Sequence, residues 1–434
     1  MERKKAIGFT AVWIACLVSS IGSPLFCSGR TEGRGDPPQD RSECYNAEWL
    51  DTVIDGSVPL NELPERLSIT NCNALLTVRT DPAADSLRYT IKGLPEKAIS
   101  VQKSSTALTL TEWDIRPRDR RTGNSWDRII AGIELVIPAS AAITELNVSS
   151  AIGDSRITGV SCGTLEVSSS VSQMSVSDST CQTLLVRSGV APLKLSNIAC
   201  GTCDVTTSTA HVFIENFQAE KEALFHTSVG SVEILNGTLH NPFLDLTGGL
   251  DFTGTVTGNV RLKCGIGRVA MDLQNSDKIG RFDITGSVGS MQLKRFSAES
   301  LTLDTSTGST RLDAVNAGKA AVRASTGSMH CTDCTLQNAR VVLSTGPFDF
   351  SGVLKAACTV EQSTGRVDLD IRAPQKDYYV YFENNSNFIR SVYVNGSAIA
   401  GTRDGSNTIG EEAIAKHKLR IKGSTGRCSI RFLE

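Results

Sequence analysis

The sequence has few aromatic residues, little net charge, few cysteines for its length and a single long apolar run. Each shortage excludes a class of protein. Only 6% of the 434 residues are aromatic, which favours thin, regularly packed layers over a thick core. The formal net charge of -2 gives no electrostatic attraction to nucleic acid, so we expect no nucleic-acid partner. The 13 cysteines are too sparse for a fold that depends on disulfides, as small secreted scaffolds do.

The apolar run lies at the N-terminus, where the first 28 residues predict a signal peptide or an N-terminal anchor. Basic residues at positions 3–5 precede an apolar stretch from Ala6 to about Leu25, which is typical of a secretory signal. The stretch nearly reaches bilayer length, so an uncleaved anchor is an alternative. Cys27 is a candidate lipidation site, although the bulky Phe26 stands where such a site prefers a small residue. We expect export to the periplasm or cell surface, with membrane contact only through an uncleaved or lipidated N-terminus.

Internal repetition is the strongest signal in the chain. One small residue at a turn, here called the marker, recurs about every 19 residues, and in the later repeats it is the glycine of a Ser-Thr-Gly tripeptide. The markers are Gly153, Ser172, Ala191, Ala210, Gly230, Gly248, Gly267, Gly289, Gly308, Gly327, Gly346 and Gly365, and the tripeptide returns at Gly426. A sharp corner needs permissive backbone angles, so we interpret the marker glycines as structural turn residues.

Apolar residues keep fixed places around each marker. Leu165 and Val167 precede the marker Ser172, and Met174 and Val176 follow it, so each repeat predicts two short strands with alternating pattern. One repeat cannot bury its own apolar face, but stacked repeats can. The sequence therefore predicts an all-β fold, a β-solenoid with about 19 residues per coil that is capped at both ends.

The pattern also divides the chain. Residues 29–43 are polar and rich in Gly, Arg, Asp and Pro, which predicts a flexible tether. Residues 44–138 predict an N-terminal β cap of irregular first strands, and residues 139–370 the regular coils. Residues 371–434 predict an irregular coil rich in tyrosine, a polar loop and a closing coil. We interpret this end as a cap, with a tyrosine-lined binding patch as the alternative.

Cysteines and outward carboxylates are the candidate chemical groups. Most cysteines fall on apolar positions, which favours small core residues, although Cys331 and Cys334 have the spacing of a redox or zinc motif. No histidine completes a ligand set beside them. His330, Asp349 and Asp368 fall three residues after successive markers, and we expect them to stack on one outer face. They are weak candidates for a metal site, and we favour a solvated face of mixed charge as their explanation. We expect no catalytic residue and no cofactor.

These features resemble the bacterial putative-adhesin family of β-strand-repeat proteins, a domain of unknown function. The strand Ile133–Ile137 that ends at Pro138, the turn Gly153–Asp154, the Ser-Thr-Gly turns and the ending Leu419–Phe432 carry the resemblance. Three middle markers (Ser172, Ala191 and Ala210) depart from the glycine signature. The resemblance implies a right-handed β-helical fold, export or surface placement, and no established chemistry.

Together, these observations predict an exported, non-enzymatic β-solenoid. It would act as an adhesin or as a structural or binding protein of the cell envelope, with an unknown protein or glycan as partner. One alternative is a carbohydrate-active β-helix enzyme, a polysaccharide lyase or hydrolase, but the short turns leave nearly no inserted loops to form a cleft. A second alternative is an envelope scaffold that assembles end to end, against which the long terminal caps argue.

Overall fold

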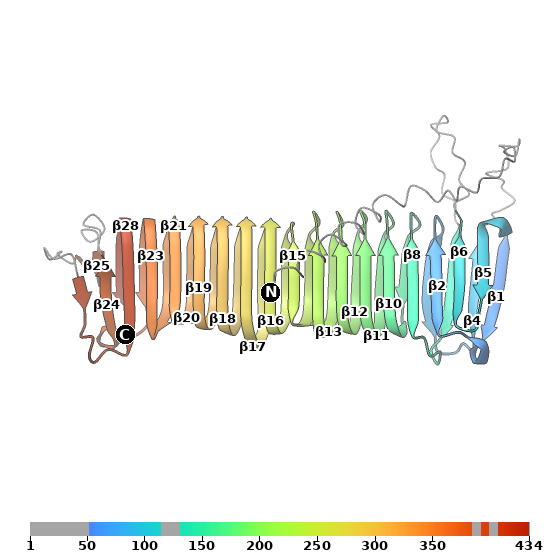
Figure 1. Ribbon diagram of the computed structural model, residues 1–434, viewed down its shortest axis with the longest axis horizontal. Helices are drawn as coiled ribbons and strands as arrows, with labels where there is room; N and C mark the ends of the chain where they lie inside the picture. Colours follow the sequence, from blue (N-terminus) through green and yellow to red (C-terminus); the bar gives the residue numbers. More distant parts are fainter. Residues whose placement is uncertain (1–51, 114–130, 384–391, 399–406, 434) are drawn as a thin grey trace, which may run out of the picture. The chain divides into compact units, whose positions relative to one another are not determined.

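The computed structural model describes residues 52–113, 131–383, 392–398 and 407–433 (Figure 1). In these residues the regular elements are strands and three short 3₁₀ turns, with no α-helix, and the strands follow a spacing of about 19 residues. The predicted all-β solenoid is confirmed. The predictions for residues 1–43, Cys27 among them, fall outside the described residues. The chain divides into two compact units, residues 1–175 and 176–434.

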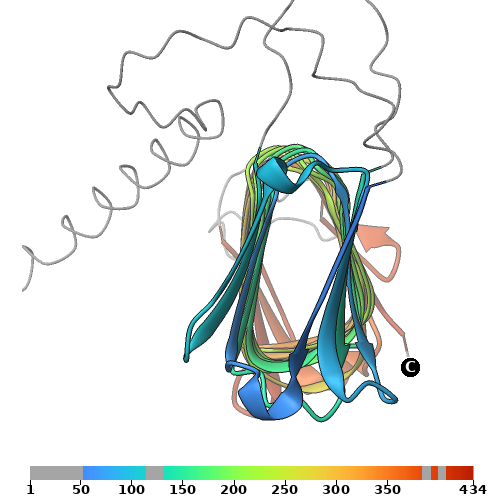
Figure 2. The ribbon, with the colours of Figure 1, turned by 90° about the vertical axis from the view of Figure 1, so that its right-hand side faces the viewer.

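The first unit contains two series of paired strands, called its two sheets here, which face each other in Figure 2. Its elements are β1 (Val53–Pro59), η3 (Leu60–Glu62), β2 (Arg66–Asn71), β3 (Leu75–Asp81), β4 (Ser86–Lys92), η4 (Glu96–Ala98), β5 (Ile99–Lys103), β6 (Ala107–Glu112), β7 (Gly132–Pro138), β8 (Glu145–Ser150), β9 (Ser155–Thr158) and β10 (Ser161–Ser169). One sheet has the order β1-β4-β7-β3-β9, and the other has the order β5-β6-β2-β8-β10.

Regular coils begin earlier in this unit than the sequence pattern suggests. Strand β2 runs parallel to β8, with Ile69 beside Val148, and β3 runs parallel to β9, with Val78 beside Ile157. Residues 66–81 therefore already form a coil, within the stretch expected to be irregular. The strands that cover its outer side pair antiparallel: β1 with β4, β4 with β7, and β5 with β6.

A buried carboxylate holds the corner of this first coil. Glu112, only 3% exposed, accepts hydrogen bonds from the backbone N–H groups of Cys72, Asn73 and Ala74 at 2.9–3.2 Å. An ionised acceptor bonded to several N–H groups forms strong hydrogen bonds. Ala74 lies beside the marker Gly153 in the next coil, and Glu112 from a later strand satisfies the backbone N–H groups of this corner.

The second unit is built from longer strands. They are β11 (Met174–Ser188), which begins just before the unit, β12 (Leu193–Thr207), β13 (Val212–Thr227), β14 (Val232–His240), β15 (Pro242–Leu246), β16 (Leu250–Ile266), β17 (Val269–Val288), β18 (Met291–Thr307), β19 (Thr310–Thr326), β20 (Met329–Gln337), β21 (Ala339–Thr345), β22 (Phe348–Lys355), β23 (Ala357–Ile371), β24 (Tyr378–Glu383), β25 (Val392–Val394), β26 (Ser397–Ala398), β27 (Asn407–Ile409) and β28 (His417–Phe432), with η5 at Gln375–Asp377.

Strands of successive coils in this unit pair in parallel and in register, side by side in Figure 1. One core column runs from Leu293 through Leu312, Cys331, Phe350 and Leu369 to Ile430, and each of these side chains is at most 2% exposed. Stacking like on like buries the apolar face that one repeat alone would expose. The predicted repeat register is thus confirmed.

The longest repeat forms no separate loop. Its extra residues lie inside β17, where the register shifts between Asp272 and Ser276 and again between Ser276 and Ile279. Ser276 is buried, and its hydroxyl accepts a hydrogen bond of 3.2 Å from the backbone N–H of Val256. The 22-residue spacing between the markers Gly267 and Gly289 predicts a small outward loop, but the strand absorbs the insertion as bulges.

The C-terminal end stacks in a different order from the chain. Strand β28 pairs directly with β23, and Gly426 lies beside Gly365. Strands β24 and β25 pair with the other side of β28. The tyrosine-rich segment therefore covers the regular coil that ends the chain, because the Ser-Thr-Gly repeat at 424–426 matches the coil at 363–365. Short antiparallel strands β26 and β27 finish this cap, a common way to protect sheet edges.

Candidate functional site

The candidate metal residues lie beside one another on an outer face of the second unit. His330 is in register with Asp349, and Asp349 with Asp368. The Nδ1 atom of His330 lies 2.9 Å from Oδ2 of Asp349. All three side chains are partly exposed, as the sequence pattern suggests. The structure therefore brings these residues together.

An arginine that the sequence reasoning missed dominates this cluster. Arg366 donates to Asp349 at 2.8 Å and lies 2.7 Å from Oδ2 of Asp368. The hydrogen bond with Asp349 raises the pKa of Arg366. Burial raises the pKa of Asp368 above its ordinary value of 3.8, although Arg366 opposes this shift. The guanidinium thus bridges the two carboxylates where a cation would have to bind.

Within the described part of the chain, no group of at least three His, Cys, Asp or Glu side chains is arranged to hold a metal ion. On the same face, Arg431 binds both carboxylate oxygens of Asp370 at 2.6 and 2.7 Å. Opposite charges on successive coils therefore pair with each other, which is the behaviour of a solvated face of mixed charge.

The cysteines of the redox-like spacing lie in the core. Cys331 and Cys334 are 2% and 1% exposed. Contact with Cys334, together with burial, raises the pKa of Cys331, whereas the same contact lowers the pKa of Cys334. Burial raises the pKa of Cys162 in the first unit to about 11, which makes this thiol a poor nucleophile at neutral pH. The expectation that the cysteines fill small core positions agrees with this placement.

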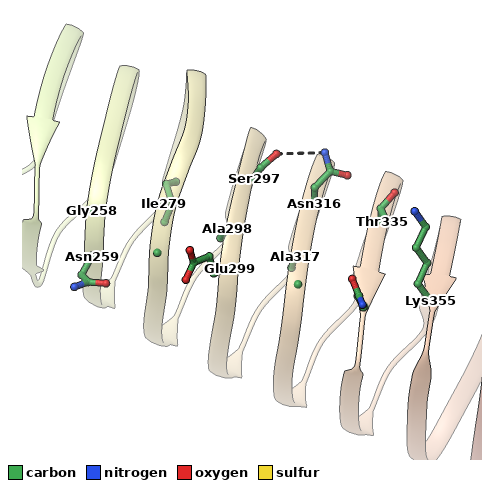
Figure 3. Close-up of a pocket in the computed structure, with 13 residues that line it drawn as sticks. Gly258, Asn259, Ile279, Ser297, Ala298, Glu299, Asn316, Ala317, Thr335 and Lys355 are labelled. Atoms are coloured by element: carbon green, nitrogen blue, oxygen red, sulfur yellow. Dashed lines mark hydrogen bonds between the residues drawn. The ribbon is translucent and has the colours of Figure 1, made fainter.

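A groove crosses six strands of the second unit (Figure 3). Its volume is about 760 Å³, and its lining residues come from β16, β17, β18, β19, β20 and β22. The floor follows one column, Ile279, Ala298 and Ala317, whose members are buried and in register. Ala298 and Ala317 are in register with the buried Leu336, so their side chains belong to the core.

Polar side chains border this floor on both sides. On one side Ser297, Asn316 and Thr335 stand in register, and the Asn316 amide donates to the Ser297 hydroxyl at 3.4 Å. The other side carries Glu299, Gly318, Gln337 and Lys355, each of which directly follows a residue of the floor column. A Cβ atom on Gly318 would lie 2.9 Å from the carbonyl oxygen of Glu299, so glycine keeps this side open.

The groove contains a single carboxylate and a single ammonium group among its described lining residues, Glu299 and Lys355. Both side chains are exposed, and neither belongs to any of the ion pairs found in the described part of the chain. The groove thus differs from the outer face with Arg366, where the carboxylates are neutralised. Its hydrogen-bonding groups are available to a ligand.

Two further ladders follow the repeat, and the sequence reasoning named neither. At one corner Asn197 donates to Asp178 at 2.7 Å, Asn216 to Asn197 at 2.9 Å, and Asn236 to Asn216 at 3.2 Å. The residue before the marker forms an exposed β-branched ridge. Its members in the second unit include Val190, Val229, Ile266, Val288, Thr307, Thr326, Thr345, Thr364 and Thr425. Both ladders follow from the same repeat of about 19 residues, at its outward-facing positions instead of its buried ones.

The family match can be set beside this geometry. The family model described as Toastrack DUF4097 matches residues 88–240 and 254–431, more than half of the chain. The chain belongs to the Toastrack family. The resemblance to a putative-adhesin family of unknown function is thereby confirmed. A search of curated proteins finds no match.

Two solved structures are similar to this Toastrack chain. A crystal structure of a "putative cell adhesion protein" from Clostridium sporogenes shares 8% identity, covers 88% of this chain and 99% of its own, and has a TM-score of 0.16. A "putative adhesin" from Bacteroides fragilis shares 11% identity, with coverage of 88% and 97% and a TM-score of 0.21. In this protein, no helix of the described segments has the length and apolar character needed to cross a membrane.

Proposed function

We propose that this Toastrack protein is an exported, non-enzymatic solenoid that binds a protein or glycan partner at the cell envelope or surface, as an adhesin does. The observation that carries the proposal is the groove across six strands of the second unit. It is long, open and lined with hydroxyl and amide groups. Concave sites with convergent polar groups are the usual places where proteins hold ligands.

The chemistry of the groove favours binding over catalysis. Glycoside hydrolysis ordinarily requires two carboxyl groups on either side of the scissile bond. Glu299 is the only carboxylate among the described lining residues. Asp349 and Asp368 form ion pairs with Arg366 on the outer face and are absent from the described lining of the groove. These features support a binding role over the alternative of a polysaccharide lyase or hydrolase.

Export is supported by the basic and then apolar N-terminal sequence. Fractionation of the cells that make the protein tests this part directly. We expect the protein in the envelope or outside the cell, where protease added to intact cells or to cells stripped of an outer membrane degrades it. Metabolic labelling with a fatty acid then tests Cys27 as an acylation site. Recovery of the intact, protease-protected protein from the cytoplasm alone would contradict the proposal.

The binding role is tested by deleting the gene and measuring attachment of the cells to surfaces and to other cells. We expect attachment to fall and to be restored by the wild-type gene and by an Asp349→Asn, Asp368→Asn double variant. Incubation of the purified protein with polysaccharides should release no new chain ends. Glycan cleavage by the wild-type protein that disappears in the double variant would contradict the proposal that the protein is not an enzyme.

A further inference from the structure

We infer that the groove of the second unit holds a short, linear, uncharged oligosaccharide, laid across the coils with about one sugar unit to each coil. This inference rests on the proposed binding function and names its ligand class. Neighbouring strands in a sheet lie about 4.8 Å apart, so the groove repeats its hydrogen-bonding groups at about that interval. An extended chain of sugars likewise presents hydroxyl groups at each unit. Ser297, Asn316 and Thr335 supply one hydroxyl or amide side chain per coil on one side of the floor.

The hydrogen-bonding groups suit hydroxyl-rich ligands. An amide both donates and accepts, and so does a hydroxyl, which matches the mixed capacity of sugar hydroxyls. Asn316 and Gln337 are exposed on opposite sides of the floor in adjacent coils. Figure 3 shows Ser297, Asn316 and Thr335 along one border, with Glu299 across the floor from them. A sugar on the alanine floor would therefore meet polar groups on both edges.

The charges of the groove favour a neutral ligand. Glu299 and Lys355 come from β18 and β22 and carry opposite signs, so the groove has no net attraction for a polyanion or a polycation. Each of them forms stronger hydrogen bonds to a hydroxyl group than a neutral side chain does. A single ammonium group is too little for a phosphate-rich polymer.

Other ligand classes fit the groove less well. A peptide commonly binds by adding a strand to an open sheet edge, but here β18, β19 and β20 are each paired on both sides within the stack. An acyl chain or an apolar side chain needs apolar surface, and the floor residues Ala298 and Ala317 are only 8% and 4% exposed. Polar and apolar atoms contribute about equally to the surface of the groove, which suits a polyhydroxylated ligand better than an acyl chain.

Calorimetry with cellotetraose and chitotetraose tests the inference on the purified protein. The first probe carries hydroxyl groups alone, and the second adds acetamide groups. We expect at least one of them to bind. Asn316→Trp, which fills the groove from an exposed position, should weaken this binding at least about tenfold, and Asn316→Ala should weaken it severalfold. The matched control is Ala321→Trp, an equally bulky change at an exposed position of the same strand β19, outside the groove.

The control should bind as wild type, within about twofold, and thermal unfolding should confirm that all variants are folded. Three outcomes would overturn the inference. Neither probe binds, or Asn316→Trp and Ala321→Trp lose affinity equally, or only a charged chain such as tetragalacturonate binds. Cell attachment separates this inference from the proposed function. If Asn316→Trp restores attachment to the deletion strain, the groove is not the binding surface, and the adhesive role stands. If wild type restores no attachment and binds neither probe, both fail.

Discussion

At the marker positions of the later coils, backbone crowding decides which residue fits. Gly308 and Gly327 have φ values of 135° and 144°, in a region that residues with a Cβ rarely adopt. A Cβ on Gly327 would lie 1.7 Å from the carbonyl oxygen of Gly308 in the coil before it. The backbone N–H of Gly327 meanwhile donates to Thr345 of the coil after it at 2.9 Å. The corner can stack this tightly only because neither residue has a side chain.

Replacing Gly327 with alanine should therefore destabilise the second unit markedly. Strained backbone of this kind costs about 1–3 kcal/mol, and the clash with Gly308 adds to it. Chemical unfolding monitored by circular dichroism measures the change. The matched control is Gly286→Ala, since the nearest atoms to a Cβ there are 3.4 Å away and its φ is not positive. If both alanine variants unfold at the same denaturant concentration as wild type, the crowding argument is wrong.

The carboxylates around Arg366 predict a dependence of stability on pH. The folded state raises the pKa of Asp368 above 3.8, chiefly by burial, so it binds a proton more tightly than the unfolded chain does. This contribution is fully present below pH 3.8 and is lost as pH rises through the folded pKa, leaving ionised Asp368 unfavourable at neutral pH. Asp368→Asn should therefore unfold at a higher denaturant concentration than wild type at pH 7, and the advantage should shrink on acidification.

The companion change Asp349→Asn should act in the opposite direction at pH 7. It removes the pairs with His330 and Arg366, which are partly exposed and together stabilise by about 1 kcal/mol or less. Unfolding curves between pH 3 and pH 7 compare the two variants. A neutral-pH loss of stability in Asp368→Asn as large as in Asp349→Asn would show that the pair with Arg366 outweighs burial.

At this scale the sequence predicts which residues share a column but not which partners they choose. The markers place His330, Asp349 and Asp368 on one face because strand register alone decides that. Arg366 was missed, since it stands one residue after a marker and reaches its partners through a long, flexible side chain. The groove was missed for a similar reason. Ala317 and Gly318 read as ordinary strand residues, and a hollow depends on what neighbouring side chains leave unfilled.

At the scale of single elements, the asparagine ladder joins equivalent bends inside β12, β13 and β14, and its residues share one backbone conformation. Asn197, Asn216 and Asn236 have φ values of 53°, 52° and 56°, in the left-handed region that asparagine tolerates better than most residues. Each amide passes a hydrogen bond to the previous coil, and Asp178 accepts the last one. Conformational preference and hydrogen bonding therefore favour the same residue at this corner.

Substitutions of Asn216 separate those two contributions. Asn216→Gly keeps the left-handed backbone accessible but removes two exposed hydrogen bonds, which should cost about 1 kcal/mol. Asn216→Ala removes the same bonds and also places a Cβ in the unfavourable region, adding about 1–2 kcal/mol. Equilibrium unfolding should show that the wild type is the most stable, Asn216→Gly is less stable and Asn216→Ala is the least stable.

Ala314 supplies the control for this prediction. It occupies the same corner in a coil without the ladder, with φ 53°. Ala314→Gly should raise stability, because it removes the conformational cost and breaks no side-chain hydrogen bond. An Asn216→Gly variant as stable as wild type would show that the ladder contributes nothing, whatever Ala314→Gly does.

At the same scale, the C-terminal strands stack in an order that differs from their order in the sequence. The Ser-Thr-Gly tripeptide at 424–426 identifies β28 as a regular coil. The sequence reasoning placed it after the tyrosine-rich coil because consecutive segments usually stack next to each other. The structure instead pairs β28 with β23, since that contact matches two regular coils, and leaves the irregular β24 outside. Tyr378, fully buried with its hydroxyl donating to Leu354 at 2.7 Å, belongs to the core of that cap.

At the scale of the whole molecule, chain length reflects the number of coils more than the number of domains. Each coil of the second unit contacts chiefly its neighbours, so its stability is close to a sum of coil and interface contributions. The narrow interior explains the 6% of aromatic residues, because stacked columns of mostly aliphatic side chains fill it. A solenoid of this kind should tolerate removal of one complete coil.

Removing residues 192–210 tests this tolerance. The deletion joins Ala191 to His211, one marker repeat of 19 residues. Val212, Ile214 and Phe217 then take the places of Leu193, Leu195 and Ile198, with which they are already in register. Asn216 takes the place of Asn197 and would bind Asp178 in its stead. We expect a folded protein with a strand-rich circular dichroism spectrum, a cooperative unfolding transition and a slightly smaller denaturant dependence, because less surface is exposed on unfolding.

The matched control removes residues 192–201 alone, about half of a coil. It joins Ala191 to Thr202, so the columns of the coils after the deletion no longer meet their partners in the coils before it. This protein should aggregate or elute in an expanded form on size exclusion, although it has lost fewer residues. If stability depends on coil register, the half-coil deletion should be more damaging than the complete-coil deletion. If the complete coil is as damaging as the half coil, then the contacts that hold the second unit together extend beyond neighbouring coils, and stability cannot be assigned coil by coil.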